Sequence, residues 1–242
     1  MRKLFSNVDW KVLLTLVGLM IPVAFLWDTW AVYPLKILVV FFHELSHGLA
    51  ALVTGGKIDR IALVAQEGGF CYTMGGSRFV ILSAGYLGSL VFGGLVLLLA
   101  ARTRWDRGVA IALGGVVLLV TLLFMRPVVS FGFGFGLATA AVLGVSGWKL
   151  PEAFNDYLLR AVGLTSCLYA VLDIKSDVLD RPEALSDAAM LSELTGLPTR
   201  FWGGIWIAIA VLAALVFLVL ACKRKPAPAG EAAAPAAAGG KP

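Results

Sequence analysis

The chain has 242 residues, of which 60% are hydrophobic and only 14% are charged, and its mean hydropathy is +0.89. A soluble domain has about 25% charged residues, so these values exclude a soluble globular protein and indicate a polytopic membrane protein. The net charge of +5 does not indicate nucleic-acid binding, because Lys and Arg form short clusters between apolar runs. Such clusters are typical of contact with lipid head groups.

The first apolar run covers residues 12–35 and contains one charged residue, Asp28. Basic residues precede the run, as they do in a signal sequence. However, the run is long and no cleavage site of the small-x-small type follows it. We therefore interpret residues 12–35 as an uncleaved first span.

The second apolar run, residues 37–55, reads ILVVFFHELSHGLAALVTG and is about as long as a bilayer core is thick. It contains the ionisable residues His43, Glu44 and His47. Ionisable side chains cost free energy at this depth in the membrane and are usually functional there. The two histidines are four residues apart and so share one face of a helix. Two imidazoles at this spacing can hold a zinc ion, and Glu44 can take a proton from water, as in HExxH zinc peptidases.

Residues 57–78 form the first polar stretch of any size. Two short β-prone runs, joined by a turn that contains Gly68 and Gly69, predict a β-hairpin. One interpretation is a simple re-entry loop. The other is an edge strand beside the active site that receives an extended peptide by strand addition.

The remaining apolar runs predict further spans. They cover residues 79–101, 108–125, 128–148, 151–172 and 201–222. The run 128–148 contains FGFGFG, which is weak in a helix interior, so it is either a span or a re-entrant segment. In the second case six spans remain, and the positive-inside rule favours both chain ends in the cytoplasm.

The predicted fold class is thus an all-α polytopic membrane protein with six or seven transmembrane helices and a short β-hairpin after the HExxH helix. A polar segment, 174–200, contains a further helix-like stretch that ends at Gly196. We expect residues 1–222 to form one membrane-embedded metalloprotease domain. Residues 223–242 are rich in Ala, Pro and Gly, and we predict a disordered tail there.

A catalytic zinc ion usually has three protein ligands and one open position. His43 and His47 are the only histidines of the chain, and the three cysteines show no metal-binding spacing, so the third ligand should be a carboxylate. Asp173, which follows the span 151–172, is the first choice. The alternatives, in falling order, are Asp177, Asp156, Asp187 and Glu67.

The HELSH helix, the glycine-rich GGSRFVILSAGYLGS that follows it, and the later LDIKSD and SDAAMLSELTGLP resemble the site-2-protease-like membrane zinc metallopeptidases, specifically their bacterial M50B-like branch. The resemblance extends from about residue 35 to residue 210. It implies a Zn²⁺-dependent protease that cuts membrane-embedded substrates, with an Asp on a later helix as the third ligand. By position, that ligand maps best to Asp173. The NPDG motif of the larger class is absent, and LDI at 172–174 is the nearest match.

We therefore expect a multi-pass metalloprotease of the bacterial plasma membrane, with Glu44 as general base and His43, His47 and Asp173 as zinc ligands. Its partners are expected to be the lipid bilayer and a membrane protein or peptide substrate, with no nucleic acid. Two alternatives stay open. One is a transporter that uses the buried His and Glu side chains as a proton relay, and the other is an inactive protease relative that acts as a scaffold.

Overall fold

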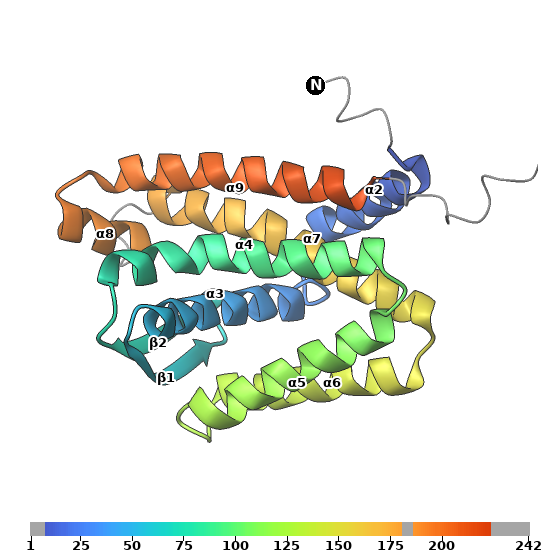
Figure 1. Ribbon diagram of the computed structural model, residues 1–242, viewed down its shortest axis with the longest axis horizontal. Coiled ribbons are helices and arrows are strands. Elements are labelled where there is room, and N and C mark those ends of the chain that lie inside the picture. Colours follow the sequence, from blue (N-terminus) through green and yellow to red (C-terminus); the bar gives the residue numbers. More distant parts are fainter. Residues whose placement is uncertain (1–7, 181–185, 224–242) are drawn as a thin grey trace, which may run out of the picture.

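The computed structural model describes residues 8–180 and 186–223 of the chain. The predicted tail, 223–242, lies outside this part except for Lys223. The molecule is a polytopic α-helical membrane protein with one small sheet (Figure 1). In the described residues, the helices are α2 (Trp10–Phe25), α3 (Tyr33–Val53), α4 (Arg78–Arg102), α5 (Asp106–Phe124), α6 (Phe131–Lys149), α7 (Glu152–Lys175), the π-helical η1 (Ser176–Asp180), α8 (Asp187–Thr195) and α9 (Thr199–Ala221).

The predicted first span over residues 12–35 is wrong. The first helix, α2, contains Pro22 and ends at Phe25, and the chain then turns before α3 begins at Tyr33. Pro34 explains the new start, since proline fits the first turn of a helix but not its interior. Among the described helices, six are long and apolar enough to cross a membrane, and the 16-residue α2 is shorter than these.

The run 128–148 is not re-entrant, because its residues from 131 on belong to α6, an uninterrupted helix of 19 residues that is long and apolar enough to cross a membrane. Two of the three glycines of FGFGFG serve close packing rather than a break, and the third, Gly134, has no atom within 4 Å of a built Cβ. A Cβ built on Gly136 would lie 2.2 Å from Thr121 Oγ1 on α5, and one built on Gly132 would lie 2.9 Å from the backbone nitrogen of Leu63 on β1. The phenylalanine–glycine alternation therefore lets α6 approach α5 and the sheet closely.

The predicted β-hairpin is confirmed. Strands β1 (Lys57–Val64) and β2 (Gly68–Met74) pair antiparallel, with Ile61 opposite Cys71. The other side of β1 is bridged to the chain after α5, where the backbone N–H of Arg126 donates to the carbonyl oxygen of Ile61 at 3.0 Å. In the described part of the chain, β2 is therefore the edge strand of the sheet.

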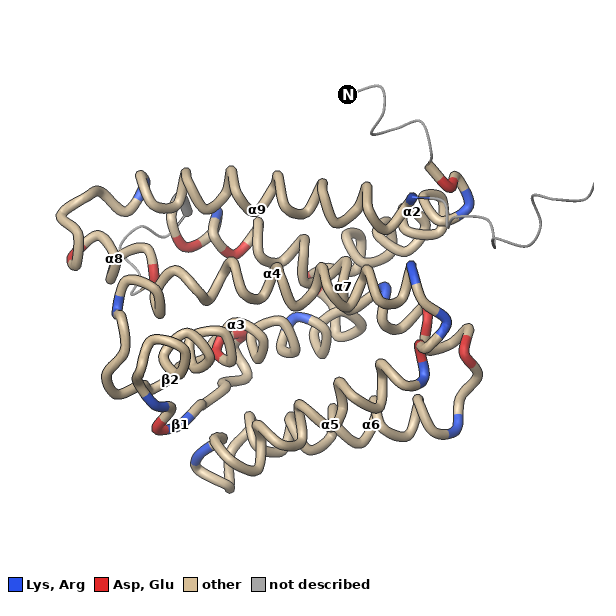
Figure 2. The backbone as a smooth tube through the Cα atoms, viewed as in Figure 1, with Lys and Arg blue, Asp and Glu red and all other residues tan. Residues whose placement is uncertain are grey.

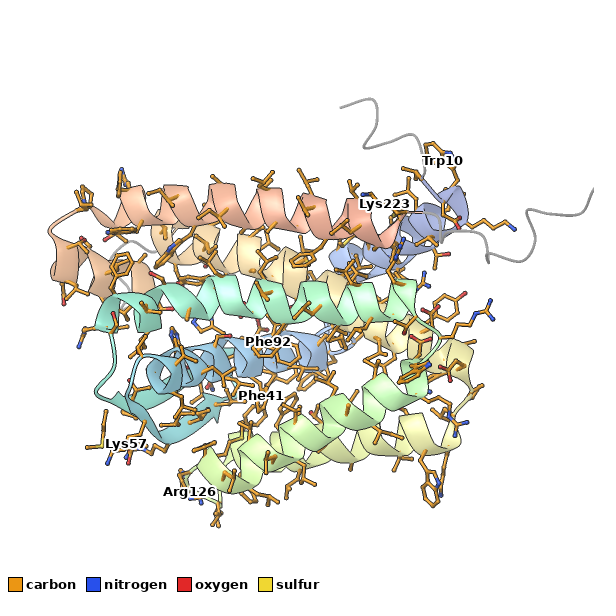
Figure 3. All side chains as sticks on the ribbon, in the orientation of Figure 1. Trp10, Phe41, Lys57, Phe92, Arg126 and Lys223 are labelled. Carbon is orange, nitrogen blue, oxygen red and sulfur yellow. The ribbon has the colours of Figure 1, made fainter. Side chains whose placement is uncertain are left out.

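Helix α3 lies at the centre of the molecule, in contact with α4, α7 and both strands (Figure 1). Charged residues gather near the ends of the long helices, and the middle stretches of α5, α6 and α9 have none (Figure 2). Trp10 and Lys223 lie together at one end, and Lys57 and Arg126 lie at the opposite end (Figure 3). Both ends of the described chain thus lie on one side of the helix array, as an even number of spans requires.

Candidate metal centre

The two histidines of α3 lie one turn apart with their rings in contact, 4.8 Å between centroids. His47 is buried, and its Nδ1 lies 2.7 Å from the carbonyl oxygen of Ile81 on α4. A carbonyl oxygen can only accept, so Nδ1 carries the proton and the Nε2 lone pair of His47 is left available. A hydrogen bond of this kind is how proteins orient a metal-binding imidazole.

Asp187 reaches both imidazoles from the first turn of α8. Its Oδ2 lies 3.0 Å from His43 Nε2 and 3.2 Å from His47 Nε2. Ser186 caps α8 by accepting from the backbone N–H of Ala189, and this cap places Asp187 at the start of the helix. Since α8 packs on α4 and α9, tertiary contacts bring the carboxylate to α3.

These three side chains suit a divalent metal ion. Their candidate ligand atoms all lie within 4.8 Å of one another, and in the described residues no other group of His, Cys, Asp and Glu does so. Two imidazole nitrogens and one carboxylate oxygen are a usual donor set for a catalytic zinc ion. Burial alone would raise the pKa of the Asp187 carboxyl, but His47 and His43 outweigh it and hold this pKa below its ordinary value.

Glu44 lies beside this group and is held by the edge strand. It is buried, and a Cβ built on Gly69 would lie 2.6 Å from Glu44 Cγ, so only glycine fits opposite it. The backbone N–H of Cys71 donates to the Glu44 carboxylate. Burial, with Glu44 nearby, raises the pKa of the Cys71 thiol to about 12. Cys71 does not belong to the group formed by His43, His47 and Asp187.

A cavity of about 1080 Å³ connects these groups. One wall is β2, and the others come from α3, from the start of α4, and from the end of α7 with η1. His43, Glu44, His47 and Asp187 all line it. The cavity thus brings the candidate metal-binding group, the Glu44 carboxylate and the edge strand β2 to one space.

The other predicted carboxylates do not belong to the group with the two imidazoles. Asp173 lines the cavity but is not in the group with the two imidazoles, and Asp177 accepts a hydrogen bond from the Tyr86 hydroxyl at 2.7 Å. Asp156 pairs with Arg160 at 2.6 Å on the same helix, as the four-residue spacing predicts. Glu67 pairs with Lys36 at 2.7 Å.

Sequence reasoning placed Asp187 behind three other aspartates because it favoured proximity to the end of a span. The serine cap and the alanines after it predict a helix that starts at Asp187, but they do not indicate what this helix faces. Gly85 was also not recognised as a site residue. A Cβ there would lie 2.4 Å from His43 Nε2, so α4 approaches the metal-binding face only because this residue is glycine.

Comparison with known proteins gives one match. The model of a family described as Peptidase M50B-like matches residues 16–217, which is most of the chain. Neither a curated protein nor a solved structure matches the chain significantly.

Proposed function

The chain belongs to the Peptidase M50B-like family, and we propose that it is an integral-membrane zinc metalloprotease that hydrolyses peptide bonds of membrane-associated or membrane-embedded substrates. The observation that carries this proposal is the contact of one Asp187 oxygen with both imidazoles of HELSH, beside Glu44 in a shared cavity. The proposed location is the bacterial plasma membrane.

In this proposal His43, His47 and Asp187 hold the zinc ion. Asp187 takes the place that the sequence suggested for Asp173, because it is the carboxylate that touches both imidazoles. When bound, zinc supplies Lewis acidity that polarises a carbonyl group and acidifies water. The hydrogen bond from His47 to Ile81 and the close approach of Gly85 keep the two rings in place for this role.

Glu44 acts as general base and then as general acid. Its carboxylate accepts a proton from the attacking water and passes it to the nitrogen of the leaving amine. The Cys71 N–H and the close contact with Gly69 fix the orientation of this carboxylate. The position of Glu44 between the imidazoles in the HExxH motif keeps proton transfer next to the bond that is cut.

A substrate must lie extended in the cavity, because a helix hides its carbonyl groups in internal hydrogen bonds. We propose that it pairs with β2, the edge strand, which lines the cavity from Gly68 to Thr73. The substrate would then lie between β2 and the wall formed by α7 and η1. This arrangement fits a membrane peptide that has unwound locally.

The test is metal analysis and cleavage by protein purified in detergent, with a labelled unfolded protein such as casein as the probe. Native protein is expected to hold about one zinc ion per chain. Glu44→Gln should keep zinc and lose about 10³-fold in cleavage rate. Native protein that is metal-free after purification with zinc would favour the proton-relay function instead.

The ligand assignment is tested by a matched pair of variants. Asp187→Ala should lose zinc, whereas Asp173→Ala, which alters the same cavity, should keep it. The reverse result would return the third ligand to Asp173. Loss of zinc in both variants would mean that the wall of the cavity, rather than one carboxylate, retains the metal.

A further inference from the structure

Lys36 is a buried ammonium group in the first turn of the apolar helix α3. Only 5% of the residue is exposed, and its Nζ lies 2.7 Å from Glu67 Oε1. The ammonium group also lies 5.2 Å from the centre of the Trp27 ring. A buried charge is costly unless it is paired, so both contacts are needed to keep Lys36 in this place.

The partner of Lys36 sits in the turn of the β-hairpin. Glu67 has a left-handed backbone, with φ of 59°. Two tyrosines hold the same turn: the Tyr33 hydroxyl donates to the carbonyl oxygen of Ala65 at 2.7 Å, and the Tyr169 hydroxyl donates to that of Glu67 at 3.4 Å. The turn is therefore fastened to the start of α3 and to α7.

The hairpin turn leads directly into β2, the strand that contacts Glu44. Gly69, two residues after Glu67, packs against the Glu44 side chain, and Cys71 donates its N–H to the Glu44 carboxylate. Glu67 and Trp27 also line the cavity, which contains the candidate metal-binding group as well. A displacement of the turn would therefore move β2 relative to Glu44 and change the width of the cavity.

We propose that Lys36 is a positioning residue, which through its ion pair with Glu67 holds the hairpin turn and so keeps β2 against α3, along the cavity where the substrate lies. This inference rests on the proposed function for the identity of what lies in the cavity. Glu44 is on α3, but its carboxylate accepts from the N–H of Cys71 on β2, so the loss of the ion pair should weaken substrate binding and also slow the chemical step.

The hairpin offers a matched control. Asp59 and Arg60 on β1 also form an ion pair, at 3.0 Å, but their side chains are 45% and 46% exposed. An exposed pair of this kind contributes little. Asp59→Asn removes this pair and leaves the Arg60 guanidinium over the Tyr72 ring, 4.0 Å from its centre, so it changes the charge of the same hairpin without loosening the turn.

The test uses Cys71 as a built-in reporter of the gap between β2 and α3. Cys71 is half-buried, and a Cβ built on Gly48 of α3 would lie 3.5 Å from its Sγ, so movement of β2 away from α3 exposes this thiol further and should speed its alkylation. The rate of reaction with N-ethylmaleimide is followed at Cys71 by peptide mass spectrometry. Lys36→Met should raise this rate about tenfold, whereas Lys36→Arg and Asp59→Asn should leave it within about twofold.

A second variant covers the case in which Lys36→Met does not fold. Lys36→Met with Glu67→Gln removes both charges and leaves no unpaired charge behind. The fold is therefore kept while the ion pair is lost. The double variant should also react about tenfold faster at Cys71. A rate within twofold of native in the folded variants overturns the proposal.

In a second experiment, KM and kcat for the cleavage of labelled casein are measured with the same variants. Loss of the ion pair should raise KM about tenfold and also lower kcat, because Glu44 loses the N–H of Cys71, with zinc content unchanged and with recovery in Lys36→Arg. Equal losses in kcat and zinc content would show general damage to the site and overturn the positioning role. If native protein cleaves nothing while the Cys71 rates follow the expected pattern, the proposed function fails and the role of Lys36 in holding the strand stands.

Discussion

Helices α3 and α9 are both long and apolar enough to cross a membrane, but they are buried to very different extents. Helix α9 is the most apolar of the six candidate spans in the described chain, yet only 17% of its span is buried. Helix α3 is much less apolar, and 78% of its span is buried. Lipid is as apolar as leucine, so in a membrane protein high hydropathy marks contact with lipid, and polar residues mark the interior.

The polar residues of α3 explain this arrangement. His43, Glu44 and His47 need partners that lipid does not offer, and they find them on α8, β2 and α4. Helix α9 contributes few buried residues, chiefly Trp206, whose ring lies 5.3 Å from that of Tyr86. The comparison predicts that equal substitutions have large effects around α3 and small effects on α9.

The largest difference between the surroundings of α3 and helix α9 is expected in zinc affinity and cleavage, when a methyl group is added to a glycine. Gly85→Ala places a Cβ 2.4 Å from His43 Nε2 and 2.6 Å from His47 Cε1, so it should lower zinc affinity by about 10²-fold and abolish cleavage. Gly204→Ala on α9 meets no atom within 4 Å and should change neither. Zinc content after dialysis against a chelator series measures both variants. Equal zinc retention would show that α4 can shift to make room.

A difference in stability is expected for large-to-small substitutions. Phe42 on α3 is 1% exposed and stacks on Phe92 of α4 at 5.5 Å, so Phe42→Ala should cost about 3 kcal/mol of unfolding free energy. Leu212 on α9 is 66% exposed, and Leu212→Ala should cost less than about 0.5 kcal/mol. Denaturant titration in mixed micelles measures both. Similar costs would mean that another chain or a tightly bound lipid covers α9.

The smallest effect is expected where the two regions meet, at Tyr86. Tyr86→Phe keeps the ring against His43 and Trp206 but removes the hydrogen bond from the hydroxyl to Asp177, so it should cost about 1 kcal/mol in stability. Zinc content should stay the same. Tyr157→Phe, on the exposed side of α7, serves as the control and should be neutral. A large loss of zinc in Tyr86→Phe would give the hydroxyl a direct part in the metal site.

Much of the fold could be predicted from local patterns. The apolar runs located most of the spans, and the Gly-containing turn after HELSH located the hairpin, because hydropathy over about 20 residues and turn chemistry are local properties. The first span was misjudged, since its apolar run continues through a turn near Pro34. The Phe–Gly run was ambiguous, because two of its glycines are explained only by the contacts of α6 with α5 and β1.

The candidate site, too, could be predicted only in part from local patterns. The spacing of His43, Glu44 and His47 within one helix was sufficient to predict a metal-binding face, because four residues in a helix always return to that face. Asp187 could not be chosen over Asp173 on the same basis. It lies 144 residues from His43 in the chain, and the contact between them exists because α8 packs on α4 and α9.

The amino-acid sequence by itself determined that this chain is a helical membrane protein and that a pair of imidazoles with an adjacent carboxylate lies on one helix face. The tertiary structure alone decided which aspartate meets those imidazoles, which strand lies against Glu44, and what Lys36 pairs with. The reason is physical. Helix periodicity and hydropathy act over a few residues, whereas the third member of the site is selected by the packing of helices that are distant in the chain.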